Sequence, residues 1–417
     1  MPPAHIAVFS YAAGGHVTPI LGLVEELVGR GHRVTWVTTE EFSARVAAGG
    51  ATAVLHPASK PVFAREAVDI TPENAAELSV AQFRQTTDAG DVAEAHFADD
   101  APDLVLYDAT VLAVGRMISL KLGCPAVQVF PTFAANDKFN LFEKMPETSR
   151  MLAETGVSRM LADMLGEFLA LHGLDVSVEE FYSKAEPLSL AVLPKAFQYA
   201  HERFDDDRVV FVGPCLGARA DDRHWEPPAD SDLPVVLVSL GSHRYNKGEQ
   251  LLRNCVAALA DVPCHVVLAT GRHLRPEDLG PLPPHFEARS WVPQTAVLRR
   301  ADALVSSGGM GGTTEAMYFG VPLVSVPVMP EQTAVADRVA ETGIGVEVPY
   351  EEATPERLRD AVTHVLSDAG IRHRMNEFQR YTREAGGSSR AVDAIEGYLK
   401  SVREDPMTTT HRADADG

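Results

Sequence analysis

Cysteine is scarce in this chain, with four residues among 417. Cys124, Cys215, Cys255 and Cys264 include no CxxC pair, so neither a zinc site nor a disulfide framework is indicated. Free cysteine is among the most buried residue types. We therefore expect four reduced, buried thiols with a structural role.

Positive charge is also in short supply. Lysine and arginine total 37 against 58 aspartates and glutamates, which gives a formal net charge of −21. An acidic surface repels nucleic acid and anionic membranes, so the sequence argues against both as partners. The apolar run at 6–9 is far too short to cross a bilayer, and the N-terminus lacks the pattern of a secretory signal. We expect a cytoplasmic protein.

What is present fits a globular enzyme of two domains. Hydrophobic residues make up 45% and charged residues 23% of a chain long enough for two cores. The acidic, proline-bearing stretch 217–233 is typical of an exposed linker. We therefore predict domains at 1–216 and 234–385, a helix within 386–403 that packs back on the first domain, and a disordered tail at 404–417.

The most informative stretch is the glycine-rich run at 305–315. It predicts a strand, a turn and a helix that begins at Thr313 and ends at Phe319, before Gly320. Glycines let the backbone approach a ligand, and a helix N-terminus offers unpaired N–H groups with partial positive charge, which together suit a phosphate. Glu315 is placed to accept hydrogen bonds from a sugar diol. A tight turn without a ligand fits the glycine pattern equally well.

The first half opens with a β-α-β pattern. Strands are predicted at 5–10 and 32–38, with a helix between them that starts at Thr18 as N-cap and Pro19 as first helical residue. This is the start of a Rossmann-like half, in which ligands lie at the carboxyl ends of the strands. The loop at 11–17 occupies that position.

A histidine and an aspartate follow two of these strands. His16 lies in the first loop, and its ordinary pKa suits general base catalysis near neutral pH. Asp108 ends the apolar strand 104–108 at the same sheet edge, where its carboxylate could hold the other ring nitrogen. The alternatives are a solvated or helix-capping His16, and an Asp108 that caps the helix near Val111.

Two further stretches of the first half have alternative interpretations. Segment 137–185 is helical and rich in Met, Leu and Phe. We interpret these side chains chiefly as core, with an apolar acceptor pocket as the alternative. The acidic run Asp205–Asp207 invites a metal site, but a solvated loop is the favoured interpretation.

The second half repeats the alternation of strands and helices. The predicted strands span 234–242, 265–270, 286–292, 302–306 and 323–327, and the predicted helices span 248–260, 294–300, 333–342, 354–367 and 390–402. An α/β architecture of two facing Rossmann-like domains with a cleft between them follows.

Together these motifs resemble the family 1 glycosyltransferases of the GT-B fold, and within them the bacterial macrolide and antibiotic glycosyltransferases. The likeness covers residues 4–400. The motifs that carry it are Gly15-His16-Val17-Thr18-Pro19, Val238-Ser239-Leu240-Gly241-Ser242, Trp291-Val292-Pro293-Gln294, the glycine run through Glu315, and Glu331-Gln332.

The resemblance implies an inverting, metal-independent transfer of a sugar from a nucleotide diphosphate to a hydroxyl of a hydrophobic small molecule. His16 would be the base, assisted by Asp108. No cofactor is implied, because the nucleotide sugar is a co-substrate, and a homodimer is compatible with the family. The implied donor contacts are Trp291 and Val292 beside the nucleobase, Gln294 and Glu315 on the ribose, Ser242, Gly309, Gly311, Gly312 and Thr313 around the diphosphate, and Glu331 and Gln332 on the sugar hydroxyls.

Two departures from the family pattern bear on the donor. Ser307 stands where the family usually has a histidine that donates to the diphosphate. Serine can still donate a hydrogen bond there, so Ser307 is counted among the donor-binding residues, but it is shorter and uncharged. Glu331 stands where the family often has aspartate. A dTDP-deoxysugar is therefore an alternative to a UDP-sugar. Three other functions stay open: a nucleotide-sugar 2-epimerase, a non-catalytic auxiliary partner of another glycosyltransferase, and a protein that sequesters nucleotide sugars.

Overall fold

The structure is a computed structural model that describes residues 2–57, 71, 74–205, 207–217, 224–229, 232–241, 246–271 and 274–404. Ser242 and Asp206, which the sequence analysis singled out, lie outside these residues. Within them, no helix is both long and apolar enough to cross a membrane.

The first domain is built on a parallel sheet of seven described strands in the order β3-β2-β1-β4-β5-β6-β7. These strands are β1 His5–Phe9, β2 Arg33–Thr38, β3 Thr52–Leu55, β4 Leu104–Asp108, β5 Ala126–Phe130, β6 Leu188–Ala191 and β7 Val209–Phe211. The connecting helices are α1 Gly14–Gly29, α2 Glu40–Ala48, α3 Ala75–Thr87, α4 Gly90–Phe97, α5 Leu112–Leu122, α6 Pro146–Glu154, α7 Val157–Leu171 and α8 Val178–Ser183, with short 3-10 turns η1 Ala109–Val111, η2 Leu141–Lys144, η3 Lys195–Phe197 and η4 His201–Arg203.

Side chains of each strand alternate between two cores, as the pleat requires. In β1, Ile6 and Val8 pack with α1 and the last helix, whereas Ala7 and Phe9 pack with α4, α5 and α7. Both faces of the sheet are therefore covered by helices, which leaves the carboxyl edge of the strands for ligands.

The second domain repeats this plan with the strand order β10-β9-β8-β11-β12-β13. Its strands are β8 Val235–Ser239, β9 His265–Ala269, β10 Phe286–Arg289, β11 Ala303–Ser306, β12 Leu323–Ser325 and β13 Gly345–Glu347. Its helices are α9 Asn246–Leu259, α10 Gln294–Leu298, α11 Met310–Phe319, α12 Pro330–Thr342, α13 Pro355–Ser367 and α14 Ala369–Glu384, with 3-10 turns η5 Pro276–Leu279 and η6 Tyr350–Glu352. The two-domain Rossmann-like α/β architecture predicted from the sequence is confirmed.

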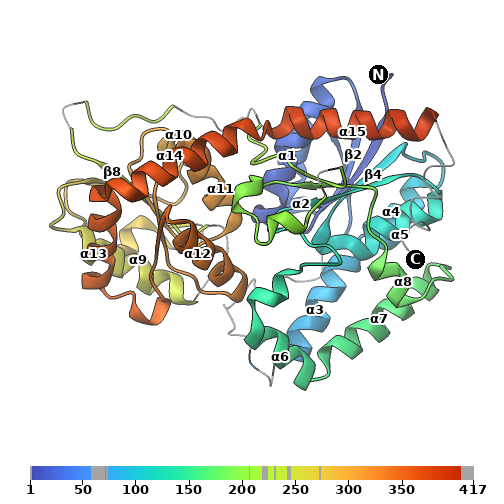
Figure 1. The fold of residues 1–417 in the computed structure, drawn as a ribbon, viewed down its shortest axis with the longest axis horizontal. Coiled ribbons are helices and arrows are strands. Elements are labelled where there is room, and N and C mark those ends of the chain that lie inside the picture. Colours follow the sequence, from blue (N-terminus) through green and yellow to red (C-terminus); the bar gives the residue numbers. More distant parts are fainter. Residues whose placement is uncertain are drawn as a thin grey trace.

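The last helix, α15 Gly387–Glu404, belongs to the first domain in space. Figure 1 shows it in red along the top of that domain, above α1, with which it is in contact. Arg30, the C-cap residue of α1, donates to Asp393 and Glu396 on α15 at 2.6 and 3.0 Å. Ile395 and Leu399 are buried in the core that α1 shares with the sheet. The exact domain boundaries at 216, 234 and 386 stay a prediction.

Three helices that carry predicted site residues begin earlier than predicted. Helix α1 starts at Gly14 rather than after Thr18, so Pro19 lies inside it and His16 lies in its first turn. Helix α11 starts at Met310 rather than Thr313. Helix α12 starts at Pro330 rather than 333. In α1 and α11, glycines with low helix propensity suggested a loop, and the packed apolar face overrides that preference.

Two expectations about burial also need correction. The methionines of segment 137–185 are half-buried rather than core: Met145, Met151, Met160 and Met164. Their neighbours Leu165, Phe168 and Leu169 do form core. The helices therefore keep an apolar stripe that solvent reaches.

The linker is not exposed throughout, since Trp225 is only 7% exposed. Its indole donates to Glu287 at 3.1 Å and stacks on His265 with ring centroids 6.1 Å apart. This part of the linker is fixed to the second domain.

Candidate active site

His16 and Asp108 meet at the point where the strand order of the first sheet reverses. His16 lies in the first turn of α1, which follows β1, and Asp108 ends the neighbouring β4. The His16 Nδ1 atom lies 2.6 Å from Oδ2 of Asp108. Open α/β sheets bind ligands at such a reversal point. The structure thus brings together the pair that the sequence singled out.

Asp108 is fully buried and held by backbone donors. Its Oδ1 accepts from the N–H of Thr110 at 2.8 Å, and its Oδ2 accepts from the N–H of Tyr11 at 3.3 Å. Burial raises the pKa of Asp108, but His16 and these N–H groups outweigh burial and hold the pKa below its ordinary value. The helix-capping interpretation of Asp108 is therefore also correct, because one oxygen caps η1 while the other binds His16.

The pKa of His16 is raised. Burial lowers the pKa, but the charge and hydrogen bond of Asp108, with a further contribution from the charge of Glu331, raise it by more. Glu331 belongs to α12 of the second domain, so both domains act on this imidazole. The His16 side chain is still 23% exposed, which leaves the ring open to a ligand.

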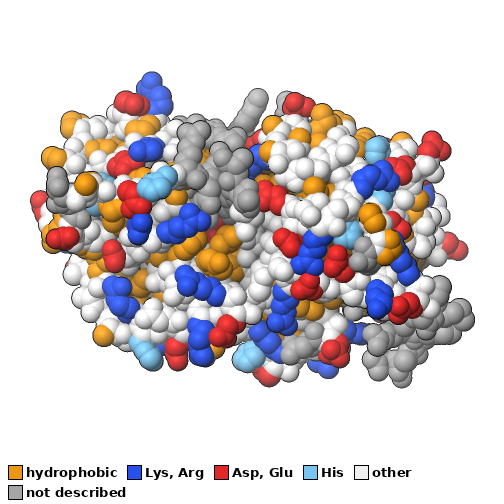
Figure 2. Space-filling view, turned by 90° about the horizontal axis from the view of Figure 1, so that it is seen from above, with side chains coloured by type: hydrophobic (Ala, Val, Ile, Leu, Met, Phe, Trp, Pro, Cys, Tyr) orange, Lys and Arg blue, Asp and Glu red, His pale blue; other side chains and the backbone are white. Residues whose placement is uncertain are grey.

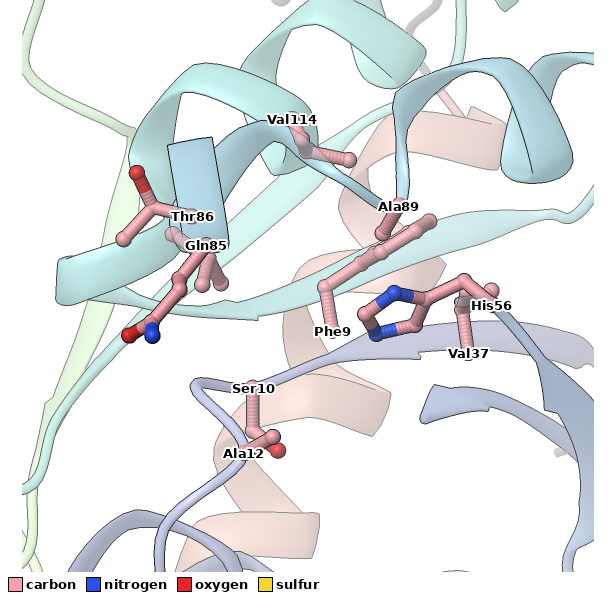
Figure 3. Close-up of a pocket in the computed structure, with 10 residues that line it drawn as sticks. Phe9, Ser10, Ala12, Val37, His56, Gln85, Thr86, Ala89 and Val114 are labelled. Atoms are coloured by element: carbon pink, nitrogen blue, oxygen red, sulfur yellow. The ribbon is translucent and has the colours of Figure 1, made fainter. Parts of the chain in front are cut away.

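A small pocket lies at the carboxyl ends of β1 and β2 (Figure 3). The loop after β1 contributes Ser10 and Ala12, and α3 contributes Gln85 and Thr86. Most other lining residues are apolar, and His56 adds an imidazole. The pocket's volume of about 10 Å³ has room for about one water molecule, so the pocket is not an acceptor cavity by itself.

The glycine run forms the first turn of α11, so more of it is helical than predicted. Thr313 is the first residue whose N–H bonds within the turn, to the carbonyl of Gly309 at 3.1 Å. The N–H groups of Met310, Gly311 and Gly312 precede it and have no intrahelical partner. A Cβ at Gly309 or Gly311 would meet no atom within 4 Å. This turn can accept an anion, which the dipole of α11 favours.

The Thr313 hydroxyl is buried and has no hydrogen-bond partner among the described residues. An unpaired buried hydroxyl is unusual in proteins and invites a ligand. It lies in the same helical turn as the free N–H groups.

Two residues implied for the donor, Gln294 and Glu315, form a continuous set of hydrogen bonds with Ser239. The Ser239 hydroxyl donates to Gln294 at 2.9 Å, and the Gln294 amide donates to Glu315 at 2.7 Å. Trp291, two residues after the end of β10, is 50% exposed, whereas Val292 is buried. Gln294 and Glu315 thus lie together, and Trp291 offers an open ring for stacking.

The Ser307 hydroxyl is paired within the second domain. It is buried and donates to the carbonyl of Leu240 at 3.0 Å. It ties the loop after β8 to the glycine run. A role for Ser307 at the diphosphate stays a prediction.

Glu331 and Gln332 occupy the first turn of α12. Glu331 is exposed, and Gln332 is buried with its amide oxygen accepting from the N–H of Val328 at 3.1 Å. Helices α1 and α11 are also in contact. The turns that carry His16, the glycine run and Glu331 are thus brought to one region between the sheets.

Sequence reasoning missed Tyr11, Thr110 and Ser239 as parts of the site. Tyr11 and Thr110 act through backbone N–H groups on Asp108, which no side-chain pattern reveals. Ser239 precedes a glycine motif that was recognised, so its place at a strand end was the available signal. Asp205 accepts from the N–H of Asp207 at 3.0 Å, as a solvated turn does.

Comparison with known proteins agrees with the fold. The family described as "Erythromycin biosynthesis protein CIII-like, C-terminal domain" matches residues 253–384. The chain is 36% identical over 404 residues to the NDP-glycosyltransferase YjiC of Bacillus subtilis (strain 168), covering 96% of this chain and 98% of that protein. It is also 36% identical over 415 residues to the oleandomycin glycosyltransferase of Streptomyces antibioticus, covering 97% and 94%.

A solved structure leads to the same class. The crystal structure of CalG4, the calicheamicin glycosyltransferase, superimposes with a TM-score of 0.84 at 37% identity, covering 96% of this chain and all of that one. Two facing doubly wound sheets with a histidine–aspartate pair in one and a glycine-rich helix start in the other define a GT-B glycosyltransferase. The chain belongs to family 1 of these enzymes, alongside the macrolide and antibiotic glycosyltransferases.

Proposed function

We propose that this enzyme transfers a sugar from a UDP- or dTDP-sugar to a hydroxyl of a hydrophobic natural product of the macrolide or polyketide type, with inversion and without a metal. The observation that carries the proposal is the 2.6 Å contact between His16 and Asp108. Asp108 holds Nδ1, which leaves Nε2 as the nitrogen that faces an acceptor hydroxyl.

In the proposed step, Nε2 of His16 takes the proton of the acceptor hydroxyl while its oxygen attacks the anomeric carbon. The bond from that carbon to the diphosphate oxygen breaks on the opposite face, and Asp108 stabilises the imidazolium. The N–H groups of Gly311 and Gly312, with the Thr313 hydroxyl, receive the charge on the leaving diphosphate. General base catalysis of this kind contributes about 100- to 10,000-fold.

The acceptor class rests on two supports. The relatives named above act, by their names, on oleandomycin and calicheamicin. In this chain, the half-buried methionines of α6 and α7 supply an adaptable apolar surface, which suits bulky acceptors. The donor nucleotide is left between UDP and dTDP, because serine at position 307 lacks the length and charge of the family histidine.

The test is mass spectrometry of products from a panel of UDP- and dTDP-sugars with macrolide and polyketide acceptors. We expect a mass gain of one hexose or deoxyhexose on the acceptor, undiminished by EDTA. His16→Ala should lower turnover about 100-fold or more, while calorimetry shows nucleotide binding nearly unchanged. Isomerisation of the donor without acceptor would instead favour a 2-epimerase, and inactivation by EDTA would require a metal.

A further inference from the structure

One contact between the two domains is built from two side chains that reach in opposite directions. Tyr199, in the loop after β6 of the first domain, donates its hydroxyl to the carbonyl of Ala334 in α12 at 2.9 Å. Arg338, one turn further along α12, reaches back to the loop of the first domain. We call Tyr199 and Arg338 together the clamp.

The guanidinium of Arg338 binds three backbone carbonyls at once. Its Nε donates to the carbonyl of Phe197 at 3.0 Å, and its Nη2 donates to those of Ala196 and Gln198 at 3.2 Å each. The guanidinium carbon also lies 5.0 Å from the centroid of the Tyr199 ring. Arginine presents several donors in a fixed fork, so this arrangement fixes orientation as well as distance.

The loop that receives Arg338 is itself held rigidly in the first domain. Gln198 is fully buried, and its amide accepts from the N–H of Ala134 at 2.9 Å and donates to the carbonyl of Ala134 at 3.2 Å. Tyr199 is 3% exposed, in the apolar cluster that contains Val335 and Val339 of α12. A polar contact inside such a cluster resists water and holds its geometry.

Ala200 gives an independent sign that this loop is shaped for the contact. Its φ is 48°, and it is the one non-glycine residue with positive φ among the described residues. The left-handed conformation is unfavourable for an alanine, because its Cβ approaches the following carbonyl oxygen. Such strain persists where the surroundings require it, and it often marks a functional segment. Here it directly follows Tyr199.

The clamp lies on the same helix as the residues implied for the donor sugar. Glu331 is three residues before Ala334, which is about 4.5 Å along the helix axis. The charge of Glu331 reaches His16 on the other domain. Helix α12 therefore connects the clamp to the place where the base and the sugar meet.

We propose that Tyr199 and Arg338 are positioning residues: by fixing α12 on the first domain, they set the placement of the Glu331–Gln332 turn relative to His16. This rests on the proposed transfer reaction for its kinetic consequence. The nucleotide contacts at 291–315 lie on the second domain alone, so they do not depend on the clamp.

The experiment compares wild type with Tyr199→Phe, which removes one hydroxyl, and Arg338→Met, which keeps length without donors. The matched control is Arg383→Met. Arg383 makes the same kind of contact within the second domain, with a 3.0 Å bond to the carbonyl of Tyr318 and its guanidinium 5.4 Å from that ring. Thermal melting confirms that each variant is folded.

We expect each clamp variant to lower kcat about 10-fold, since small misplacements of reacting groups cost this much or more. The Kd of the nucleotide that binds wild type, UDP or dTDP, should stay within about two-fold, because the nucleotide contacts lie on the second domain alone. The acidic limb of the pH–rate profile should move to lower pH, because His16 would keep its contact with Asp108 but lose the nearby charge of Glu331, which raises its pKa. The control should match wild type throughout.

The proposal is overturned if both clamp variants match the control in kcat, or if kcat and nucleotide affinity fall by the same factor. X-ray scattering in solution tests the clamp independently of whether the proposed reaction takes place. Even if wild type glycosylates none of the acceptors, the clamp variants should show a larger radius of gyration than the control. Equal radii would then contradict the clamp.

Discussion

At the scale of single residues, the account depends on how Asp108 tunes His16. A base works only when it is unprotonated, and the pKa of His16 lies above its ordinary value of 6.5. Activity should therefore be lost as the pH falls through a value above 6.5. A histidine with no such partner would lose activity only at lower pH.

Asp108→Asn removes the charge of this side chain and keeps its size and shape. Without the carboxylate, burial dominates and the pKa of His16 falls, so the acidic limb of kcat/KM moves to lower pH. The amide also fails to fix the ring tautomer, so kcat should drop about 100- to 10,000-fold. Steady-state rates from pH 5 to 9 measure both. An unmoved limb would mean that another group titrates.

Glu347, on β13, gives a residue-scale prediction about stability. Burial and the neighbouring Asp337 carboxylate raise its pKa from 4.5 to about 7. The folded state thus keeps a proton that the unfolded chain has released, so its stabilising effect is complete below pH 4.5 and is lost as the pH rises through about 7.

Glu347→Gln removes this titration. We expect the variant to melt at a higher temperature than wild type at pH 8, with a smaller difference at pH 5. Differential scanning fluorimetry across that range checks it. A difference that is the same at both pH values would show that the carboxylate does not titrate there.

At the scale of elements, the start of α11 makes a sharp prediction. Gly311→Ala places a methyl group where no atom lies within 4 Å. In a helix, alanine is favoured over glycine by roughly 1 kcal/mol, so the melting temperature should hold or rise. If the diphosphate approaches this backbone, the methyl group should weaken nucleotide binding about 10-fold, because close approach is the role glycine serves there.

Gly397→Ala in α15 is the control, since its Cβ also meets nothing within 4 Å. It should gain stability without a change in nucleotide affinity. Calorimetric titration with UDP and dTDP distinguishes the two variants. If Gly311→Ala and Gly397→Ala bind nucleotide with equal affinity, the diphosphate does not bind at the start of α11.

The elements also show how far the sequence can be read. Buried strands such as β1, β4 and β8 are continuous apolar runs, so their place and the α/β class were predictable. The edge strand β13 has three residues and was missed, because its order comes from packing: a Cβ at Gly345 would lie 2.2 Å from the carbonyl oxygen of Leu323. Helix α14 was missed as well, in a stretch read only as part of the second domain.

For the site, the chemistry of residue types was readable and their contacts were not. The pairing of His16 and Asp108 followed from two strand ends on one sheet edge. The turn of Ser307 toward Leu240 depends on the distance between two loops 67 residues apart in sequence. Neither propensity nor spacing reports such a distance.

At the scale of the whole molecule, the reversal points of the two sheets face a common region, and the chain returns through α15 to join the first domain. Because the net charge is negative, the surface as a whole does not attract anions. On the face seen in Figure 2, acidic and basic side chains are interspersed. We therefore propose that local N–H groups and a helix dipole, rather than a basic surface, recognise the diphosphate.

The most direct test of this account is a crystal structure with UDP or dTDP bound. We predict that the diphosphate lies within hydrogen-bonding distance of the N–H groups of Gly311 and Gly312, with its terminal phosphate directed toward His16 across the domain boundary. A nucleotide bound in the first domain, away from the start of α11, would contradict the account.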